Sequence, residues 1–350
     1  MSLYETLAKL PIKVERYSLE PHKLVIVGGQ DRHTTVIRLE GNNKAGLGED
    51  VTYETEDQLA FQKAGPQLDL TSPTTLDEFC ELVGGMDLFP KPPKMEVFRR
   101  YRRWAFESAA LDLALRQNGL SLAEAVGREP KAVHFVVSQR LGKPSSTKLL
   151  DARLEQYPNL RFKLDPTNDW DDAIIKRLVE TKAVQTLDLK GFYKGTVVDV
   201  ETDPALYRKL ASAFSDAYLE DPDVTDETRP ILEPHAARIT WDAPLHTAED
   251  ILHMPFQPKT INVKPSRFGG IEELCKVYEL CGRENIAMYS GGQFELDVGR
   301  GHIQYLASLF HPDTPNDASP TAYHVDELAP GLPSTVLEPK LDRMGFRWLV

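Results

Sequence analysis

Five short apolar runs, each closed by a charged residue, decide the fold of this chain: Leu160-Arg161-Phe162-Lys163, Leu187-Asp188, Leu219-Glu220, Trp241-Asp242 and Val263-Lys264. The gaps between the closing residues are 25, 32, 22 and 22 residues, so each leaves room for one helix and the next strand. Repeats of this kind predict parallel strands joined by crossover helices. Because active sites of such folds lie at the carboxyl ends of the strands, we expect the five charges to meet there.

Further apolar runs at Val133–Ser138 and Ile286–Tyr289 extend the repeat, and Asp171–Glu180 and Ile271–Cys281 are amphipathic segments between runs. Seven such units within residues 131–325 favour an α/β fold of the modified TIM-barrel type, (β/α)7β, over a doubly wound sheet. No GxGxxG follows the first strand and no P-loop is present, which argues against a nucleotide fold.

The first 130 residues do not show this strand–helix repeat. Two β-rich runs, Lys23–Val27 and Thr34–Leu39, precede a break expected at Gly46-Leu47-Gly48. Helices are then predicted near Leu76–Val83 and over Val97–Gln117. This pattern predicts an α+β capping domain of residues 1–130, joined by the C-terminal segment 326–350, with the barrel in residues 131–325.

Composition limits the classes of partner. The 350 residues carry 41 Lys and Arg against 53 Asp and Glu, a net charge of −12, which argues against nucleic-acid and anionic-membrane partners. No apolar run approaches the roughly 20 residues of a membrane span, and the first residues do not resemble a secretory signal. Three scattered cysteines argue against a disulfide framework or a zinc site, so we expect a cytoplasmic protein.

Asp188, Glu220 and Asp242 form the chemical centre of the prediction. Three carboxylates that converge on one mouth repel each other unless a cation neutralises them. Oxygen ligands without His or Cys select Mg²⁺, with Mn²⁺ as an alternative. Lys163 and Lys264 flank this metal site in the strand order, and a lysine with cationic neighbours is a usable base near neutral pH.

Ile261–Ile271 (INVKPSRFGGI) resembles the sixth-strand segment of the enolase superfamily, in its muconate-lactonizing-enzyme-like branch (the mandelate racemase/muconate lactonizing enzyme type). Further segments resemble that branch as well: Leu160–Asp172, Tyr218–Pro222 and Ser290–Gly292 in the barrel, and Gly46–Glu49 and Ala105–Ala114 in the capping domain. The resemblance implies Mg²⁺-dependent abstraction of the proton α to a carboxylate, through an enediolate. It also implies a small carboxylate substrate and a homo-oligomer.

Within that resemblance, the acid/base lysines fall on Lys163 and Lys264, and the metal ligands on Asp188, Glu220 and Asp242. Arg161 stands where the first lysine of the KxK motif is usual, and Lys190 where an asparagine is common. In the alternative register, Lys163 would be the first lysine and Asp165 would replace the second. We favour the Arg161/Lys163 register because the downstream PxxDW segment then falls into place.

Other residues are candidates for contact with substrate: Arg161, Ser138, Lys190, Gln293 and Glu295. We expect specificity to lie in two capping-domain loops near Gly28–His33 and Gly46–Tyr53, which close over the barrel mouth. Phe98–Trp104 (FRRYRRW) is interpreted as a solvated or ion-pairing face of the long helix rather than as a nucleic-acid patch.

These observations predict an isomerase or a carbon–oxygen lyase. Two working bases permit racemisation or epimerisation, whereas one base suffices for cycloisomerisation or for elimination of water. The sequence does not choose among these reactions. An acid-sugar dehydratase on the same scaffold and a non-catalytic homologue are the alternative interpretations.

Overall fold

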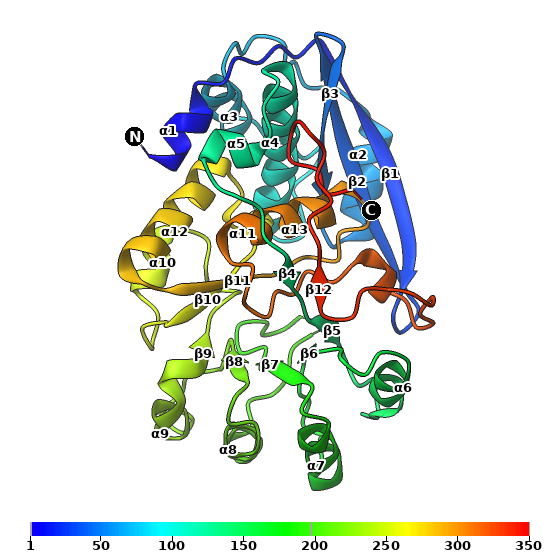
Figure 1. Ribbon diagram of the computed structural model, residues 1–350, viewed down its shortest axis with the longest axis vertical. Helices are drawn as coiled ribbons and strands as arrows, with labels where there is room; N and C mark the ends of the chain where they lie inside the picture. Colours follow the sequence, from blue (N-terminus) through cyan, green and yellow to red (C-terminus); the bar gives the residue numbers. More distant parts are fainter. Residues whose placement is uncertain (1, 197, 350) are drawn as a thin grey trace.

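The computed structural model describes residues 2–196 and 198–349 of the chain, with its N-terminal elements at one end and its parallel strands toward the other (Figure 1). The N-terminal antiparallel sheet has the order β1-β2-β3, with β1 at Arg16–Ile26, β2 at Gln30–Gly41 and β3 at Lys44–Asp50. The accompanying helices are α1 (Leu3–Ala8), α2 (Thr55–Ala64), α3 (Leu76–Gly84), α4 (Val97–Gln117) and α5 (Leu122–Val126).

The break predicted at Gly46-Leu47-Gly48 is wrong, because these residues lie inside β3. Strand β3 packs directly on α4, and neither glycine leaves room for a side chain. A Cβ at Gly46 would lie 2.1 Å from the carbonyl oxygen of Ala109, and one at Gly48 would lie 2.0 Å from that of Ala105. The glycines are therefore needed for close approach of a strand to a helix and do not end the strand.

Parallel strands form the second part of the molecule, as predicted. One sheet has the order β5-β6-β7-β8-β9, all parallel, and β10 pairs with β11 in parallel. The strand bounds are β5 Val137–Gln139, β6 Phe162–Leu164, β7 Val184–Asp188, β8 Tyr218–Glu220, β9 Ile239–Thr240, β10 Thr260–Val263 and β11 Ala287–Ser290. The fold is thus mixed α/β with a parallel sheet.

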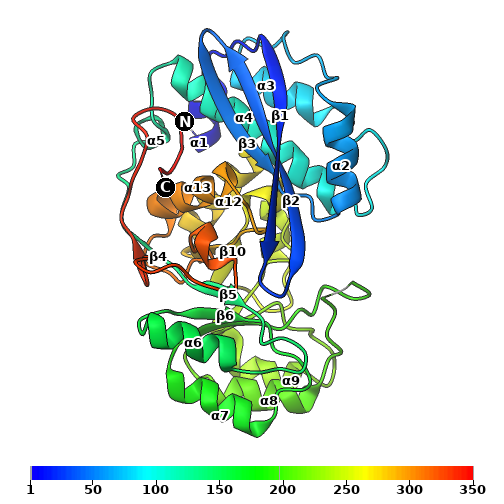
Figure 2. The same ribbon diagram turned by 90° about the vertical axis from the view of Figure 1, so that its right-hand side faces the viewer.

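Helices follow most of these strands and lie outside them (Figure 2). Their bounds are α6 Lys148–Gln156, α7 Asp172–Thr181, α8 Pro204–Ala213, α9 Arg229–Leu232, α10 Ala248–Leu252, α11 Pro265–Phe268, α12 Ile271–Glu284 and α13 Val298–Phe310. Short 3₁₀ helices cover Glu233–Arg238 and Thr321–Tyr323. The run predicted at Val133–Ser138 is divided between β4 (Val133–His134) and the start of β5.

Backbone hydrogen bonds connect the separate strand groups. Asn262 N donates to Trp241 O at 3.0 Å, which joins β10 to the end of β9. Asp317 N donates to Ser290 O at 2.8 Å at the end of β11, and Val136 N donates to Asn316 O at 2.8 Å just before β5. The strand ends therefore lie beside one another in sequence order.

The C-terminal segment runs back from the parallel strands to the N-terminal elements. Its strand β12 (Val336–Leu337) pairs with β4, and the buried Phe346 stacks on His302 with ring centroids 3.8 Å apart. Arg347 then pairs with Asp112 of α4 at 2.6 Å. These contacts tie the end of the chain to the long helix of the N-terminal part.

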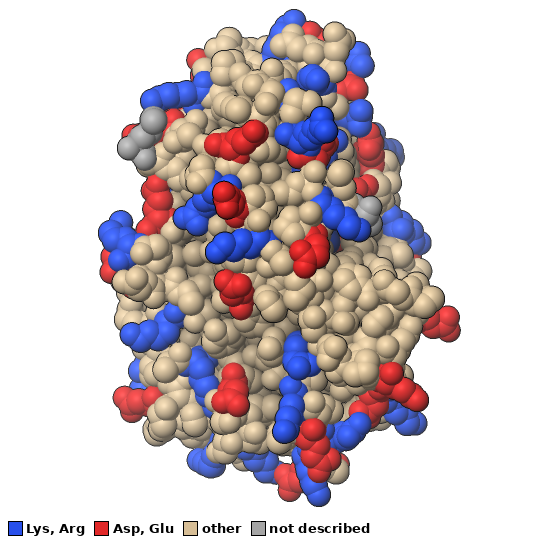
Figure 3. Space-filling view, in the orientation of Figure 1, with Lys and Arg blue, Asp and Glu red and all other residues tan. Residues whose placement is uncertain are grey.

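Charged side chains of both signs are interspersed over the face shown in Figure 3. The arginine-rich start of α4 is an ion-pairing face: Arg99 pairs with Asp87 and Arg103 with Glu107. Arg102 is fully buried against Asp50, between the rings of Phe61 and Phe89. Within residues 2–196 and 198–349, no helix combines the length and apolar character that a bilayer crossing requires.

Candidate metal and acid/base site

Three buried carboxylates meet at the carboxyl ends of neighbouring strands. Asp188 ends β7 and Glu220 ends β8, where the two residues are paired in register, and Asp242 follows β9 by two residues. One oxygen of each lies within 4.8 Å of the others. The structure therefore brings together the three residues that the sequence predicts as metal ligands.

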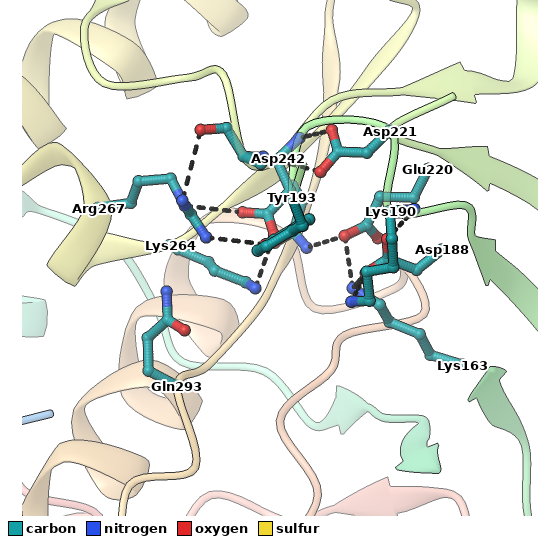
Figure 4. Close-up of polar contacts among 12 residues, drawn as sticks. Lys163, Asp188, Lys190, Tyr193, Glu220, Asp221, Asp242, Lys264, Arg267 and Gln293 are labelled. Atoms are coloured by element: carbon teal, nitrogen blue, oxygen red, sulfur yellow. Dashed lines mark hydrogen bonds and ion pairs between the residues drawn. The ribbon is translucent and has the colours of Figure 1, made fainter. Parts of the chain in front are cut away.

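Lys163 and Lys190 contact one end of this triad (Figure 4). Lys163 Nζ lies 2.5 Å from Glu220 Oε1 and 3.1 Å from Asp188 Oδ2. Lys190 Nζ lies 2.5 Å from the same Asp188 oxygen and 3.4 Å from Asp165 Oδ1. Two ammonium groups thus share one carboxylate oxygen.

Lys264 and Arg267 contact the other end of the triad. Lys264 Nζ lies 2.7 Å from Asp242 Oδ2, and Arg267 Nε lies 3.2 Å from Asp242 Oδ1. Lys264 is the residue before α11, and Arg267 is in that short helix, so one turn of chain places both cations. Tyr193 OH also lies 3.5 Å from Asp242 Oδ2 and accepts from Arg267 at 3.2 Å. The predicted lysines therefore lie at opposite ends of the carboxylate triad.

Three further residues hold the carboxylates in place. Glu220 accepts hydrogen bonds from Asn262 Nδ2 at 3.1 Å and from Tyr289 OH at 2.6 Å. Asp221, which is fully buried, accepts from the backbone N–H groups of Asp242 and Ala243. Sequence reasoning did not single these residues out as functional. The signal for Asn262 was its place inside β10, two residues before Lys264.

The charges around the triad set its protonation. Burial raises the pKa of Glu220 to about 7, although the ammonium of Lys163 opposes that shift. Burial also acts against ionisation of Asp242, but Arg267 and Lys264 together lower its pKa to about 2. Burial alone would lower the pKa of Lys163, whereas Glu220 and Asp188 raise it well above its usual value. In this arrangement the carboxylates and the lysines neutralise one another.

The donor set fits a hard divalent cation. It consists of carboxylate oxygens with no His or Cys, which is the chemistry that Mg²⁺ prefers. Asp242 Oδ1 is buried, and its ion pair with Arg267 Nε at 3.2 Å does not have hydrogen-bond geometry. A carboxylate oxygen carries two lone pairs, so one is left for a cation. The side-chain amide of Asn262 donates to Glu220 Oε1 and so orients that carboxylate.

The other candidates for substrate contact lie at different distances from the triad. Ser138 is paired in register with Lys163 on the neighbouring strand, and Lys190 is in the triad. Gln293 and Glu295 are buried in the loop after β11, where Gln293 bonds Tyr101 and Glu295 pairs with Arg300.

Alternation along an extended strand predicts that Arg161 and Lys163 share one face, toward the barrel axis, but the structure places Arg161 differently. Its guanidinium donates to the carbonyl oxygens of Asn159 at 3.0 Å and Leu160 at 2.9 Å. The physical reason is that β6 begins only at Phe162, so strand alternation does not extend back to Arg161.

Arg32 ties the N-terminal part to the site loops. It is 3% exposed and donates to the backbone carbonyls of Val51 and Thr52 and to those of Gln293 and Phe294. Glu49 adds a second link, because it accepts from the backbone N–H groups of Leu296, Asp297 and Gly299 at the start of α13. The loop predicted at Gly46–Tyr53 is wrong over its first part, because residues up to Asp50 lie in β3, and the end of this segment is fixed beside the loop after β11.

Two family models match this chain. The model described as the C-terminal domain of a domain of unknown function (DUF8230) matches residues 129–325, and its N-terminal partner matches residues 5–125. The chain belongs to the DUF8230 family.

Relatives of this DUF8230 protein include known enzymes. It is 27% identical over 321 residues to an N-succinylamino acid racemase of Thermus thermophilus, covering 86% of this chain and 82% of the relative. It is 26% identical over 239 residues to the o-succinylbenzoate synthase of Bacillus subtilis, covering 65% of this chain. The second match spans only 62% of that relative's length.

Solved structures show the same fold. A member of the enolase superfamily from Listeria innocua has a TM-score of 0.64 and 21% identity, with 89% of this chain and 86% of that chain covered. A dipeptide epimerase from Methylococcus capsulatus, complexed with Mg and the dipeptide L-Arg-D-Lys, has a TM-score of 0.70 and 18% identity, covering 97% of this chain and 100% of that one. The predicted resemblance to the enolase superfamily, in its muconate-lactonizing-enzyme-like branch, is borne out by these relatives and folds, and so is the prediction of an enzyme.

Proposed function

We propose that this protein is a Mg²⁺-dependent racemase or epimerase that removes the proton α to the carboxylate of a small acid and returns a proton to the opposite face. The observation that carries the proposal is the position of two lysines at opposite ends of one carboxylate triad. Lys163 contacts Asp188 and Glu220, and Lys264 contacts Asp242. Exchange of configuration needs a base on each face of the reacting carbon, and this arrangement supplies two.

The proposed architecture is a (β/α)7β barrel of residues 131–325, capped by residues 1–130 together with 326–350. The hydrogen bonds from β10 to the end of β9, and between residues 316–317 and both the end of β11 and the residue before β5, support closure of the strands into a ring. The pairing of β12 with β4 and of Arg347 with Asp112 supports assignment of the C-terminal segment to the cap. In such a barrel the triad lies at the carboxyl-end mouth, where barrel enzymes carry their sites.

Each residue has a defined part in the proposed reaction. Asp188, Glu220 and Asp242 would hold Mg²⁺. When bound, Mg²⁺ neutralises the negative charge that develops on the substrate carboxylate as its α-proton leaves. Lys163 takes or returns the proton on one face, and Lys264 does so on the other. Each lysine must be neutral when it acts as the base. If a cation takes over the carboxylate that pairs with the lysine, the pKa of the lysine falls, which favours its neutral form.

We propose N-acylated amino acids and dipeptides as the substrate class. The named relative acts on N-succinylamino acids, and the fold neighbour on a dipeptide. Both kinds of molecule carry a proton on a carbon between a carboxylate and an acylated nitrogen. That acidic position is the one that a pair of lysines and a metal can activate together.

A second candidate reaction is elimination of water from a small acid. It is the lyase alternative, and the relatives named o-succinylbenzoate synthase are lyases. It needs a working base on one face only, and the second lysine then serves as a cation. An acid-sugar dehydratase would follow the same logic. A non-catalytic homologue would have no reason to keep both lysines on one buried triad, but it remains an outcome of the test below.

The test follows the α-proton by NMR in D₂O with Mg²⁺, using separate enantiomers of N-succinylphenylalanine and of a set of dipeptides. We expect wild-type protein to exchange the α-proton of both enantiomers of the substrate. Lys163→Ala is expected to abolish exchange from one enantiomer and Lys264→Ala from the other. Lys276→Ala, on the exposed face of α12, is the matched control and should exchange normally.

Loss of a substrate hydroxyl without exchange would favour the elimination reaction instead. Wild-type activity that survives both Lys163→Ala and Lys264→Ala would exclude the two-base mechanism. Absence of Mg²⁺ binding in calorimetry would exclude the metal assignment of Asp188, Glu220 and Asp242.

A further inference from the structure

The connection after β7 is the longest in the strand series, and its first residues run beside the triad. The gap from Asp188 to Glu220 is 32 residues, whereas the two following gaps are 22 residues each. At the start of this connection, Leu189 N donates to Glu220 O and Gly191 N donates to Asp221 O, both at 2.8 Å. The loop is therefore held along the end of β8, beside the carboxylates.

Lys190 lies between these two anchored residues in the left-handed backbone region, with φ at +57°. A lysine adopts this conformation at a cost, so its surroundings must impose it. Gly191 shows how tightly they do so, since a Cβ there would lie 2.4 Å from the backbone nitrogen of Asp223. The result is that the side chain of Lys190 is turned into the site and is only 11% exposed.

The ammonium of Lys190 lies beside that of Lys163, because both contact Asp188 Oδ2, at 2.5 Å and 3.1 Å. Asp165 Oδ1, 3.4 Å from Lys190 Nζ, is a second anion that keeps the ammonium in place when Asp188 takes another partner. Arg161, the cation expected on this side from the sequence, instead bonds carbonyl oxygens of its own segment. The second positive charge on the Lys163 side is thus supplied by the connection after β7 and not by the residue before β6.

We propose that Lys190 binds the substrate carboxylate beside Lys163, and that it takes the place of the charge at position 161. The inference rests on the proposed function and adds to it the residue that holds the anion. The geometry carries the inference, because the ammonium of Lys190 meets that of Lys163 at one Asp188 oxygen while Arg161 bonds carbonyl oxygens of its own segment. When Asp188 binds a metal ion, Lys190 loses that partner and is free to pair with the substrate anion, while Asp165 orients it.

The test compares three Met substitutions by two measurements. Lys190→Met is the variant of interest. Lys194→Met is the matched control, because Lys194 belongs to the same loop but pairs with Asp223 and is half exposed. Arg161→Met tests the competing assignment. Calorimetric titration with Mg²⁺ in the absence of substrate is the first measurement, and KM and kcat for α-proton exchange of N-succinylphenylalanine are the second.

For Lys190→Met we expect tighter Mg²⁺ binding, by several-fold or more, because an ammonium that competes for Asp188 is gone. We expect KM to rise about 10- to 100-fold, the usual effect of losing a charged hydrogen bond, with a smaller fall in kcat. Lys190→Arg, which keeps the positive charge, should return KM most of the way to the wild-type value. Both Lys194→Met and Arg161→Met should stay within about threefold of wild type in Mg²⁺ affinity and in KM.

Unchanged Mg²⁺ affinity in Lys190→Met overturns the inference whether or not a substrate has been found. A rise in KM in Arg161→Met as large as that in Lys190→Met also overturns it. If wild-type protein exchanges no α-proton from any acid tested, the proposed function fails, which is a different result from exchange that is insensitive to Lys190. Far-UV circular dichroism of each variant separates misfolding from these effects.

Discussion

Replacement of Gly48 by alanine should destabilise the protein through the contact between β3 and α4. The added Cβ would lie 2.0 Å from Ala105 O, 2.5 Å from Ser108 Oγ and 2.8 Å from Ala109 N. An ordinary contact needs about 3.4 Å, so the strand and the helix must separate by more than 1 Å or distort. Overpacking of a core costs about 1–3 kcal/mol, and here the closest atoms are backbone, so we expect about 3 kcal/mol.

The effect should extend to the active site, because Gly48 precedes Glu49. The carboxylate of Glu49 accepts from three backbone N–H groups at the start of α13, beside the loop that holds Gln293. A displaced β3 would pull this carboxylate from its donors. We therefore expect a loss of activity in Gly48→Ala at temperatures where the protein is still folded.

Urea unfolding of wild type, Gly48→Ala and Gly282→Ala measures the predicted difference. Gly282 lies inside α12, and a Cβ added there would meet nothing within 4 Å, so alanine should stabilise the protein by up to about 1 kcal/mol through helix propensity. Both substitutions replace glycine by alanine, but they should change the free energy of unfolding in opposite directions. If Gly48→Ala unfolds at the wild-type urea concentration, the close-packing argument for β3 is refuted.

Three further predictions follow from the buried charges. At a Mg²⁺ concentration 100 times its dissociation constant, binding should stabilise the wild-type protein by about 2.7 kcal/mol and raise its melting temperature. Asp242→Asn should lose most of this rise. Thermal melts of both proteins with Mg²⁺ and with EDTA measure the difference. Arg102→Met leaves the Asp50 carboxylate buried without its ion-pair partner and should lower the free energy of unfolding by about 3–5 kcal/mol, measured by chemical unfolding. Lys13→Met is the control and should change it little, because the Lys13–Glu15 pair is exposed. Burial lowers the pKa of His311 to about 4, so the unfolded chain binds a proton between pH 6.5 and 4 that the folded chain does not. Stability should therefore fall as the pH drops through that window, by up to about 3 kcal/mol from this residue, and a pH series of unfolding curves for wild type and His311→Gln would show a shallower fall in the variant.

The candidate site was largely predictable because each of its residues directly follows an apolar run that forms a strand, and these runs occur in the chain in the same order as the strands in the fold. Parallel strands with crossover helices place their carboxyl ends at one edge, so spacing and alternation were enough to predict that Lys163, Asp188, Glu220, Asp242 and Lys264 would come together. These signals are local: an apolar run, the charge that closes it and room for one helix. Their chemical roles stay predictions until the lysine variants are measured.

Other features depended on contacts between distant segments. Propensity alone predicted a break at Gly46 and Gly48, but the approach of α4 makes them part of a strand. Alternation alone placed Arg161 beside Lys163, but where β6 begins depends on pairing with β5 and β7, and that boundary leaves Arg161 outside. Asp221 and Asn262 gained their importance from partners on adjacent strands.

The sequence by itself determined the class of fold and the chemical character of the site, because hydrophobic periodicity and the charge at each strand end are properties of neighbouring residues. Only the tertiary structure decided which cation stands beside Lys163. Lys190 takes that place because Gly191 fits against Asp223 and the chain turns at φ +57°, and a packing constraint between segments 32 residues apart in the chain leaves no periodic trace in the sequence.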